Sequence, residues 1–173
     1  MTIIVVDIEA DGPIPGDYSM ISFGAVILDN DLNKTFYSEL SPISDKWVPE
    51  ALAVSGFSRE KTLTFKDPTA EMLRFKTWIN ENCAKKRAIF AADNNGFDWQ
   101  FINWYFHHFT GSNPFGFSSM NIGSLYKGIV RDAYSSFKHL RKTKHTHNPV
   151  DDARGNAEAL LHIATKMNVK GLL

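Results

Sequence analysis

The chain has 173 residues with 19 basic and 19 acidic side chains, and its formal net charge is zero. This length suits a single domain spanning residues 1–173, and a neutral chain can bind nucleic acid only through a local basic patch. One cysteine, Cys83, excludes a disulfide framework and a cysteine-rich zinc site; together with the lack of a membrane-length apolar run or a signal peptide, it predicts a cytoplasmic protein.

The first half of the chain predicts three strands followed by two helices. A nearly continuous β-branched run at residues 3–8 is typical of a central strand buried on both faces. The next two strands are joined by a short polar turn, which predicts a hairpin. The strands are expected at residues 3–8, 20–28 and 34–40, and the helices at residues 49–54 and 68–85.

Short strands and helices alternate in the second half. Strands are expected at residues 88–92 and 119–122, a loop at 111–116, and helices at 97–109, 123–132 and 149–167. Strands first, followed by alternating strands and helices, indicate an α/β fold with a mixed central β-sheet flanked by helices on both faces.

Two acidic residues stand at the carboxyl end of the first strand. The two-residue period of a strand places Asp7 and Glu9 on one face, with Ile8 on the other. Ligands of sheets with helical crossovers gather at the carboxyl ends of strands. The two acids therefore suggest a site, and the alternative is that they are loop acids where the strand ends.

A third acid, Asp98, lies on the apolar side of its predicted helix. At about 100° per residue, it points with Phe101 and Ile102, away from the polar face of Gln100 and Asn103. A carboxylate in such a place is costly unless it is paired, hydrogen-bonded or metal-bound. The helix dipole explains an acid in the first turn, but not this orientation.

Helical phase also separates two neighbouring acids of the last helix. Asn148 is expected as its N-cap and Pro149 as its first residue. Asp151 then falls on the solvent side, whereas Asp152 flanks the apolar arc and points inward. Four inward carboxylates would repel one another and lose their charge unless cations compensate them. Carboxylate oxygens suit Mg²⁺ or Mn²⁺, and two such ions can drive phosphodiester cleavage.

Three motifs resemble the DEDD superfamily of 3′–5′ exonucleases, in the histidine-bearing branch of proofreading subunits and RNase T-like enzymes. The first is D-x-E, followed by a turn and glycine, at residues 7–12; the second is N-x-x-F-D at residues 94–98; the third is H-x-x-x-x-D-A at residues 147–153. Residues 23–26 and 49–56 also match segments found in many members. The resemblance implies a ribonuclease H-like fold.

The resemblance also assigns roles. It implies that Asp7, Glu9, Asp98 and Asp152 bind two Mg²⁺ or Mn²⁺ ions and that His147 is the general base. His145 is a candidate on its chemistry alone, but only His147 has the spacing of the family. The resemblance places the following residues at the substrate: Ala10, Asp11, Gly12, Asn94 and Phe97. Ala10 and Asp11 replace the Thr or Ser that many members have there, and Asp93 replaces a His.

The segment between residues 127 and 147 is basic and leads directly to His147. We expect Arg141, Lys142 and Lys144 to contact phosphates, and the alternative is a solvated basic loop. The function that the resemblance implies is a metal-dependent exonuclease that releases nucleoside 5′-monophosphates from the 3′ end of single-stranded RNA or DNA. The alternatives are a catalytically weak nucleic-acid-binding module of the same fold and an enzyme that trims short oligonucleotides. Members of the family include homodimers, and the sequence leaves dimerisation open.

Overall fold

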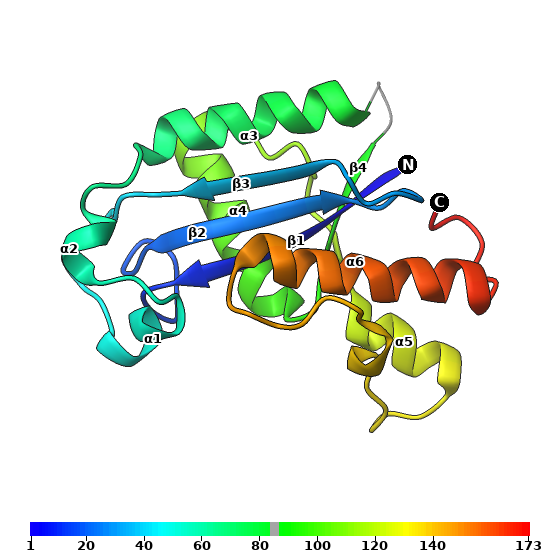
Figure 1. Cartoon of the computed structure of the whole chain (residues 1–173). Coiled ribbons are helices and arrows are strands. Elements are labelled where there is room, and N and C mark those ends of the chain that lie inside the picture. Colours follow the sequence, from blue (N-terminus) through cyan, green and yellow to red (C-terminus); the bar gives the residue numbers. More distant parts are fainter. Residues whose placement is uncertain (84–86) are drawn as a thin grey trace.

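The computed structural model describes residues 1–83 and 87–173 and contains a five-stranded sheet in the order β3-β2-β1-β4-β5 (Figure 1). The strands are β1 (Thr2–Ala10), β2 (Met20–Ile27), β3 (Thr35–Glu39), β4 (Ala88–Ala92) and β5 (Ser119–Asn121). β2 pairs antiparallel with both β1 and β3, whereas β4 pairs parallel with β1 and β5. The predicted mixed sheet, its central first strand and its hairpin are all confirmed.

The helices of the described residues are α1 (Pro49–Val54), α2 (Arg59–Thr62), α3 (Pro68–Cys83), α4 (Asn95–Thr110), α5 (Ile122–Val130) and α6 (Pro149–Lys166), with a 3-10 turn at Lys138–Leu140. The five predicted helices are confirmed with small shifts of their ends. Residues 84 and 85, expected in the helix at 68–85, lie outside the described residues. α2 and the 3-10 turn were not predicted, because elements this short carry no readable periodicity.

Alternate side chains of β1 serve two separate cores, which explains its uninterrupted apolar run. Ile4, Val6 and Ile8 pack in the core under α3 and α4. Ile3 and Val5 pack in the core under α5 and α6. Figure 1 shows these two pairs of helices on opposite faces of the sheet, so the predicted three-layer arrangement is confirmed.

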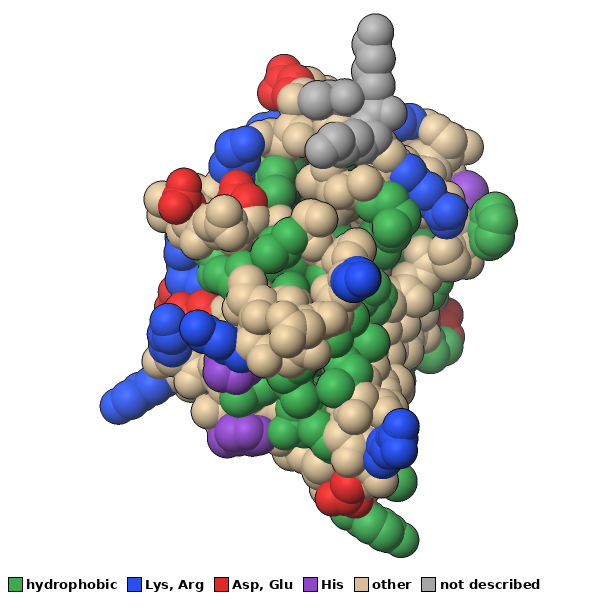
Figure 2. Space-filling view, turned by 90° about the vertical axis from the view of Figure 1, so that its right-hand side faces the viewer, with side chains coloured by type: hydrophobic (Ala, Val, Ile, Leu, Met, Phe, Trp, Pro, Cys, Tyr) green, Lys and Arg blue, Asp and Glu red, His purple; other side chains and the backbone are tan. Residues whose placement is uncertain are grey.

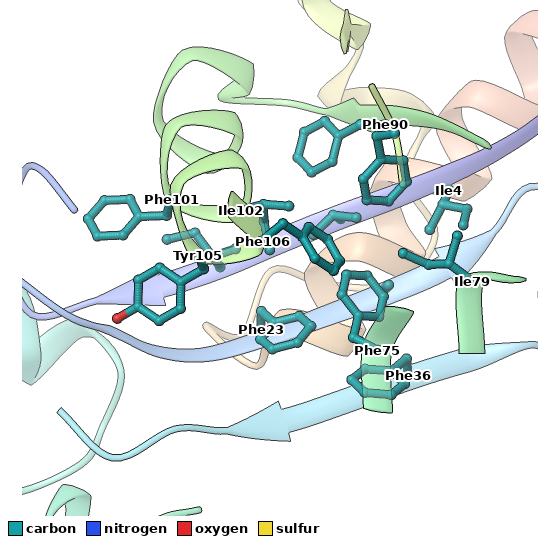
Figure 3. Close-up of a cluster of buried hydrophobic side chains, with 14 of the residues drawn as sticks. Ile4, Phe23, Phe36, Phe75, Ile79, Phe90, Phe101, Ile102, Tyr105 and Phe106 are labelled. Carbon is teal, nitrogen blue, oxygen red and sulfur yellow. The ribbon is translucent and has the colours of Figure 1, made fainter. Parts of the chain in front are cut away.

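Aromatic side chains fill the core between the sheet and the helices α3 and α4 (Figure 3). The ring of Phe75 on α3 lies with its centroid 4.9 Å from Phe23, 4.8 Å from Phe36 and 5.5 Å from Phe106. Buried aromatic pairs contribute about 0.5–1.5 kcal/mol each beyond the area that they bury. Tyr105 of α4 is also buried, and its hydroxyl accepts a hydrogen bond of 2.7 Å from the Met20 amide. The helix that carries Asp98 is therefore held rigidly on the sheet.

The first turn of α6 lies directly on β2 at Gly24. A Cβ atom at this position would stand 2.4 Å from the Val150 nitrogen and 2.6 Å from the Pro149 oxygen. Only glycine permits this approach, because such distances are far inside van der Waals contact. Asn148 caps the helix as expected, its Oδ1 accepting the Val150 amide at 3.0 Å. Among the described residues, no helix combines the length and apolar character that a membrane crossing requires.

Candidate active site

The last residues of β1 bring two carboxylates to the face that α6 covers. Asp7 and Glu9 continue the register of Ile3 and Val5, whose side chains pack in the core under α6. Asp7 pairs with Gly24 of β2, the residue on which α6 rests, and the ladder shifts register just after Glu9. Bulges of this kind re-aim side chains and are common next to active sites. The predicted common face of Asp7 and Glu9 is thus present.

Asp152 of α6 meets these two side chains. It is 2% exposed, and oxygens of Asp7, Glu9 and Asp152 all lie within 4.8 Å of one another. Asp151, by contrast, is partly exposed and accepts a hydrogen bond of 3.2 Å from the Thr146 hydroxyl. The helical phase that separated the two acids in the sequence therefore agrees with their positions in the structure.

Asp98 is the fourth acid, and it comes from the first turn of α4. It is 3% exposed, and its amide donates to the Asn94 carbonyl at 3.1 Å. It does not belong to the compact group of Asp7, Glu9 and Asp152 in the part of the chain that the structure describes. Its charge nevertheless acts on Asp7, whose pKa it helps to raise. Asp98 is therefore buried, as its helical phase predicts.

Burial dominates the electrostatics of these acids. It raises the pKa of Asp7 well above its usual value, and Asp98, Asp152 and Glu9 add to the rise by repulsion. Burial likewise raises the pKa of Asp98, although a hydrogen bond from the Ile8 amide opposes it. It raises the pKa of Glu9 to about 7, against the lowering effect of His147. Hard divalent cations would restore the ionised state of such a set of oxygens, so the residues fit Mg²⁺ or Mn²⁺.

His147 lies at the turn just before α6 and faces Glu9. Its Nδ1 is 3.5 Å from Glu9 Oε1, and its backbone is left-handed, with φ of 60°. Non-glycine residues adopt this conformation at a cost of about 1–2 kcal/mol. The amide of His147 donates to Asp152 Oδ2 at 3.0 Å, which compensates for the cost and holds the imidazole over the carboxylates.

His145 also reaches the site, and only the structure reveals how closely. Its Nδ1 lies 2.8 Å from Asp152 Oδ1, and its ring centroid is 4.3 Å from that of His147. The start of the loop that carries both histidines is bound to α6, because Glu158 of α6 accepts hydrogen bonds from the amides of Lys142 and Thr143, each at 2.7 Å. The sequence offered His145 as a histidine near the motif, but no spacing rule indicated contact with Asp152.

Arg141 has a different environment from the one expected for a phosphate contact. Its side chain is only 10% exposed, and it donates to Asp93 Oδ2 at 2.8 Å. The guanidinium also lies over the Phe137 ring, and its charge lowers the pKa of Asp7 against the raising effect of burial. The ion pair of Asp93 and Arg141 thus joins the end of β4 to residues 141–148, the loop that carries His145 and His147 and that we call the histidine loop. Lys142 and Lys144 are exposed, as phosphate contacts require.

The residues after Glu9 are turned away from solvent. Ala10 is 6% exposed and Asp11 is fully buried, where Asp11 pairs with Arg59 at 2.9 Å. Gly12 is buried beside Tyr18, so close that a Cβ would meet its ring at 2.1 Å. The charge of Asp11, which the resemblance placed at the substrate, is thus compensated by Arg59.

The two candidates of the second motif differ in exposure. Asn94 is exposed at the N-cap of α4 and makes no capping hydrogen bond with its side chain. Phe97 is half-buried and packs on Phe101 with centroids 5.2 Å apart. Asn94 therefore has a side chain free to meet a ligand, whereas Phe97 also serves the core.

Comparisons with known proteins agree with this geometry. The model of the RNase T family, described as exonuclease, matches residues 4–160. The 3′–5′ DNA exonuclease Cap18 of Escherichia coli is 37% identical over 179 residues, which cover 96% of this chain and 93% of that protein.

Solved structures show the same fold at low identity. The nuclease domain of 3′hExo bound to rAMP, a DEDDh family member, has a TM-score of 0.75 and 15% identity, covering 95% of this chain and 92% of that one. Escherichia coli exonuclease I in complex with a dT13 oligonucleotide has a TM-score of 0.74 and 14% identity. The match covers 96% of this chain but 42% of that larger protein. The expected ribonuclease H-like fold is confirmed.

Proposed function

This chain belongs to the RNase T exonuclease family, in its histidine-bearing DEDD branch, and we propose that it removes nucleoside 5′-monophosphates from the 3′ end of single-stranded DNA. The observation that carries the proposal is the convergence of Asp7, Glu9 and Asp152 within 4.8 Å, with His147 beside them. DNA is proposed because the relative that is 37% identical is named a DNA exonuclease.

The carboxylates of Asp7, Glu9, Asp98 and Asp152 would hold two divalent ions, Mg²⁺ or Mn²⁺. When bound, such ions lower the pKa of a coordinated water and stabilise the negative charge of a leaving oxygen. The protein supplies the rigid frame: β1 presents two of the acids, α4 one and α6 one. The buried side chains under these elements keep the acids in place.

His147 would take the proton of the attacking water. Its Nδ1 faces Glu9 Oε1 at 3.5 Å, so Nε2 is the nitrogen that accepts the proton. An imidazole suits this step because its unperturbed pKa lies near neutral pH. The hydrogen bond from the His147 amide to Asp152 keeps the base at a constant distance from the acids.

The DNA strand would reach the site along the histidine loop. A cavity of about 430 Å³ beside Asp93 is lined by side chains that include Lys127, Ser136 and Lys138. Together with the exposed Lys142 and Lys144, Lys127 offers positive charge to phosphates, whereas Lys138 lies 3.4 Å from Asp93. On the face that Figure 2 shows, Lys and Arg side chains stand among acidic and hydrophobic ones.

The test is digestion of 5′-labelled single-stranded DNA with Mg²⁺ or Mn²⁺. We expect a ladder that shortens from the 3′ end and releases mononucleotides. Asp152→Asn should lower the rate at least about 100-fold, because it removes a metal ligand, whereas the matched control Asp151→Asn should stay near wild type. Equal activity of the two variants, or no mononucleotide with any metal, would refute the proposal.

The same assay separates the alternative functions. Binding of DNA in EDTA without cleavage in Mg²⁺ would favour a binding module, and activity limited to the shortest members of a length series would favour an oligonucleotide-trimming enzyme. RNA, duplex DNA and single-stranded DNA of one sequence should be compared in parallel, with faster cleavage of RNA contradicting the proposed preference. The single domain, the cytoplasmic location and a homodimer stay predictions.

A further inference from the structure

A second group of ligand atoms lies beside the proposed magnesium site. Nitrogens of His145 and His147 and an oxygen of Asp152 all lie within 4.8 Å of one another. The two imidazoles stand on the same short loop, two residues apart, with their rings inclined at 68°. Both are about half exposed, with 52% and 47% of their side chains open. An ion could therefore reach them from solvent.

The loop is held in the shape that brings these atoms together. Both oxygens of Asp152 accept amides of the loop, from Thr146 at 3.0 Å and from His147 at 3.0 Å. His145 Nδ1 is 2.8 Å from Asp152 Oδ1, whereas two neighbouring ligands on a tetrahedral ion with bonds of about 2.0–2.1 Å stand about 3.3–3.4 Å apart. The two atoms must therefore separate by about 0.5 Å to admit an ion, a shift that the exposed imidazole of His145 can make.

The chemistry of this group differs from that of its neighbour. Asp7, Glu9 and Asp152 offer oxygen alone, which suits Mg²⁺ and Mn²⁺. The group of His145, His147 and Asp152 offers two imidazoles and one carboxylate, a donor set that suits Zn²⁺ and related transition ions. Asp152 belongs to both groups, so occupancy of one alters the other.

We propose that His145, His147 and Asp152 form a site for Zn²⁺ or a similar transition-metal ion, and that its occupation inhibits the exonuclease. The binding part stands on the geometry alone; the inhibition rests on the proposed function. An imidazole nitrogen that carries Zn²⁺ cannot accept a proton, and the ion draws His147 and Asp152 away from their proposed tasks. His145 is then the residue that converts a Mg²⁺-dependent centre into a zinc-sensitive one.

Zinc binding is measured first, without reference to activity. Metal-stripped protein in excess Mg²⁺ is titrated with Zn²⁺ by calorimetry, and with Co²⁺ by visible absorption, which reports nitrogen ligands. We expect one site in the wild type and at least about a tenfold loss of affinity in both His145→Ala and His147→Ala. His162→Ala is the control, because this exposed histidine lies on α6 outside the group. Wild-type affinity in His145→Ala overturns the site.

Inhibition is measured next, on the DNA assay in excess Mg²⁺. The zinc concentration that halves the rate should rise at least about tenfold in His145→Ala, in parallel with its binding constant, and should not change in His162→Ala. Equal sensitivity of His145→Ala and wild type overturns the regulatory part. If the protein binds zinc through His145 but cleaves no nucleic acid, the proposed function fails while the site stands.

Discussion

Gly24 couples the sheet to the active site, and its replacement by alanine tests whether α6 must lie this close. The added methyl would stand 2.4 Å from the Val150 nitrogen and 2.5 Å from the Pro149 carbonyl carbon. Both are backbone atoms and cannot rotate away. Separation to ordinary contact therefore requires a shift of the helix start by about 1 Å. Because Asp152 lies in the first turn, the shift moves it away from Asp7, which pairs with Gly24.

Two magnitudes follow from this shift. Overpacking of this kind costs about 1–3 kcal/mol of unfolding free energy. A displacement of about 1 Å in a catalytic group can lower the rate by about 100-fold. Gly24→Ala should therefore lose about 100-fold in rate while it stays folded, because a loss of about 1–3 kcal/mol is smaller than the stability of about 5–15 kcal/mol that is typical of a domain.

The assay is kcat on single-stranded DNA, normalised to the folded fraction from circular dichroism, with urea unfolding for stability. Gly128→Ala is the control: it lies in α5, and a Cβ there would meet nothing within 4 Å. It should keep its activity and gain up to about 1 kcal/mol, since alanine favours helix over glycine. A Gly24→Ala protein with wild-type kcat would show that the approach of α6 does not position Asp152.

Three further predictions concern paired charges. Arg59→Met leaves Asp11 buried without its partner and should cost about 3–5 kcal/mol in urea unfolding; a double variant that adds Asp11→Asn should recover part of this, and no recovery would contradict the pairing. Burial alone would raise the pKa of Glu71, but its hydrogen-bond donors lower the pKa below its usual value. The ionised side chain therefore stabilises the fold at pH values above the unfolded pKa of about 4.3, and this stabilisation is lost as the pH falls through the folded pKa. The deficit of Glu71→Gln should therefore be larger at pH 7 than at pH 3.5, and a deficit independent of pH speaks against this reasoning. Asp93→Asn frees Arg141 from its ion pair and should lower kcat about tenfold at saturating Mg²⁺, with unchanged kcat as the contrary result.

Most helices and strands of the fold could be predicted from the local periodicity of apolar side chains. The β-branched run of β1, the hairpin and the amphipathic helices were all read correctly, because side-chain burial repeats with the period of the element. The same periods oriented the acids: Asp7 and Glu9 share a face, and Asp152 rather than Asp151 points inward. The short helix α2 was not predicted, because a single turn is too short for the apolar pattern to repeat.

Pairing between distant segments is what the sequence could not decide. Arg141 was expected at the phosphates because it lies in a basic run, yet Asp93, 48 positions away, holds it in a partly buried ion pair. The resemblance placed Asp11 at the substrate, yet the side chain of Asp11 is buried in an ion pair with Arg59. Asp93 follows β4 and Arg59 begins α2, and only the folded chain brings these segments to Arg141 and Asp11.

By itself, then, the sequence determined the elements, the faces on which the acids lie and the exonuclease family, since each depends on local period or on motif spacing. The tertiary structure decided which charges are compensated and that His145 contacts Asp152. The contact of His145 with Asp152 depends on the close approach of α6 to Gly24 and on the path of the loop before α6. Such distances are set by packing across the whole molecule, which no local pattern records.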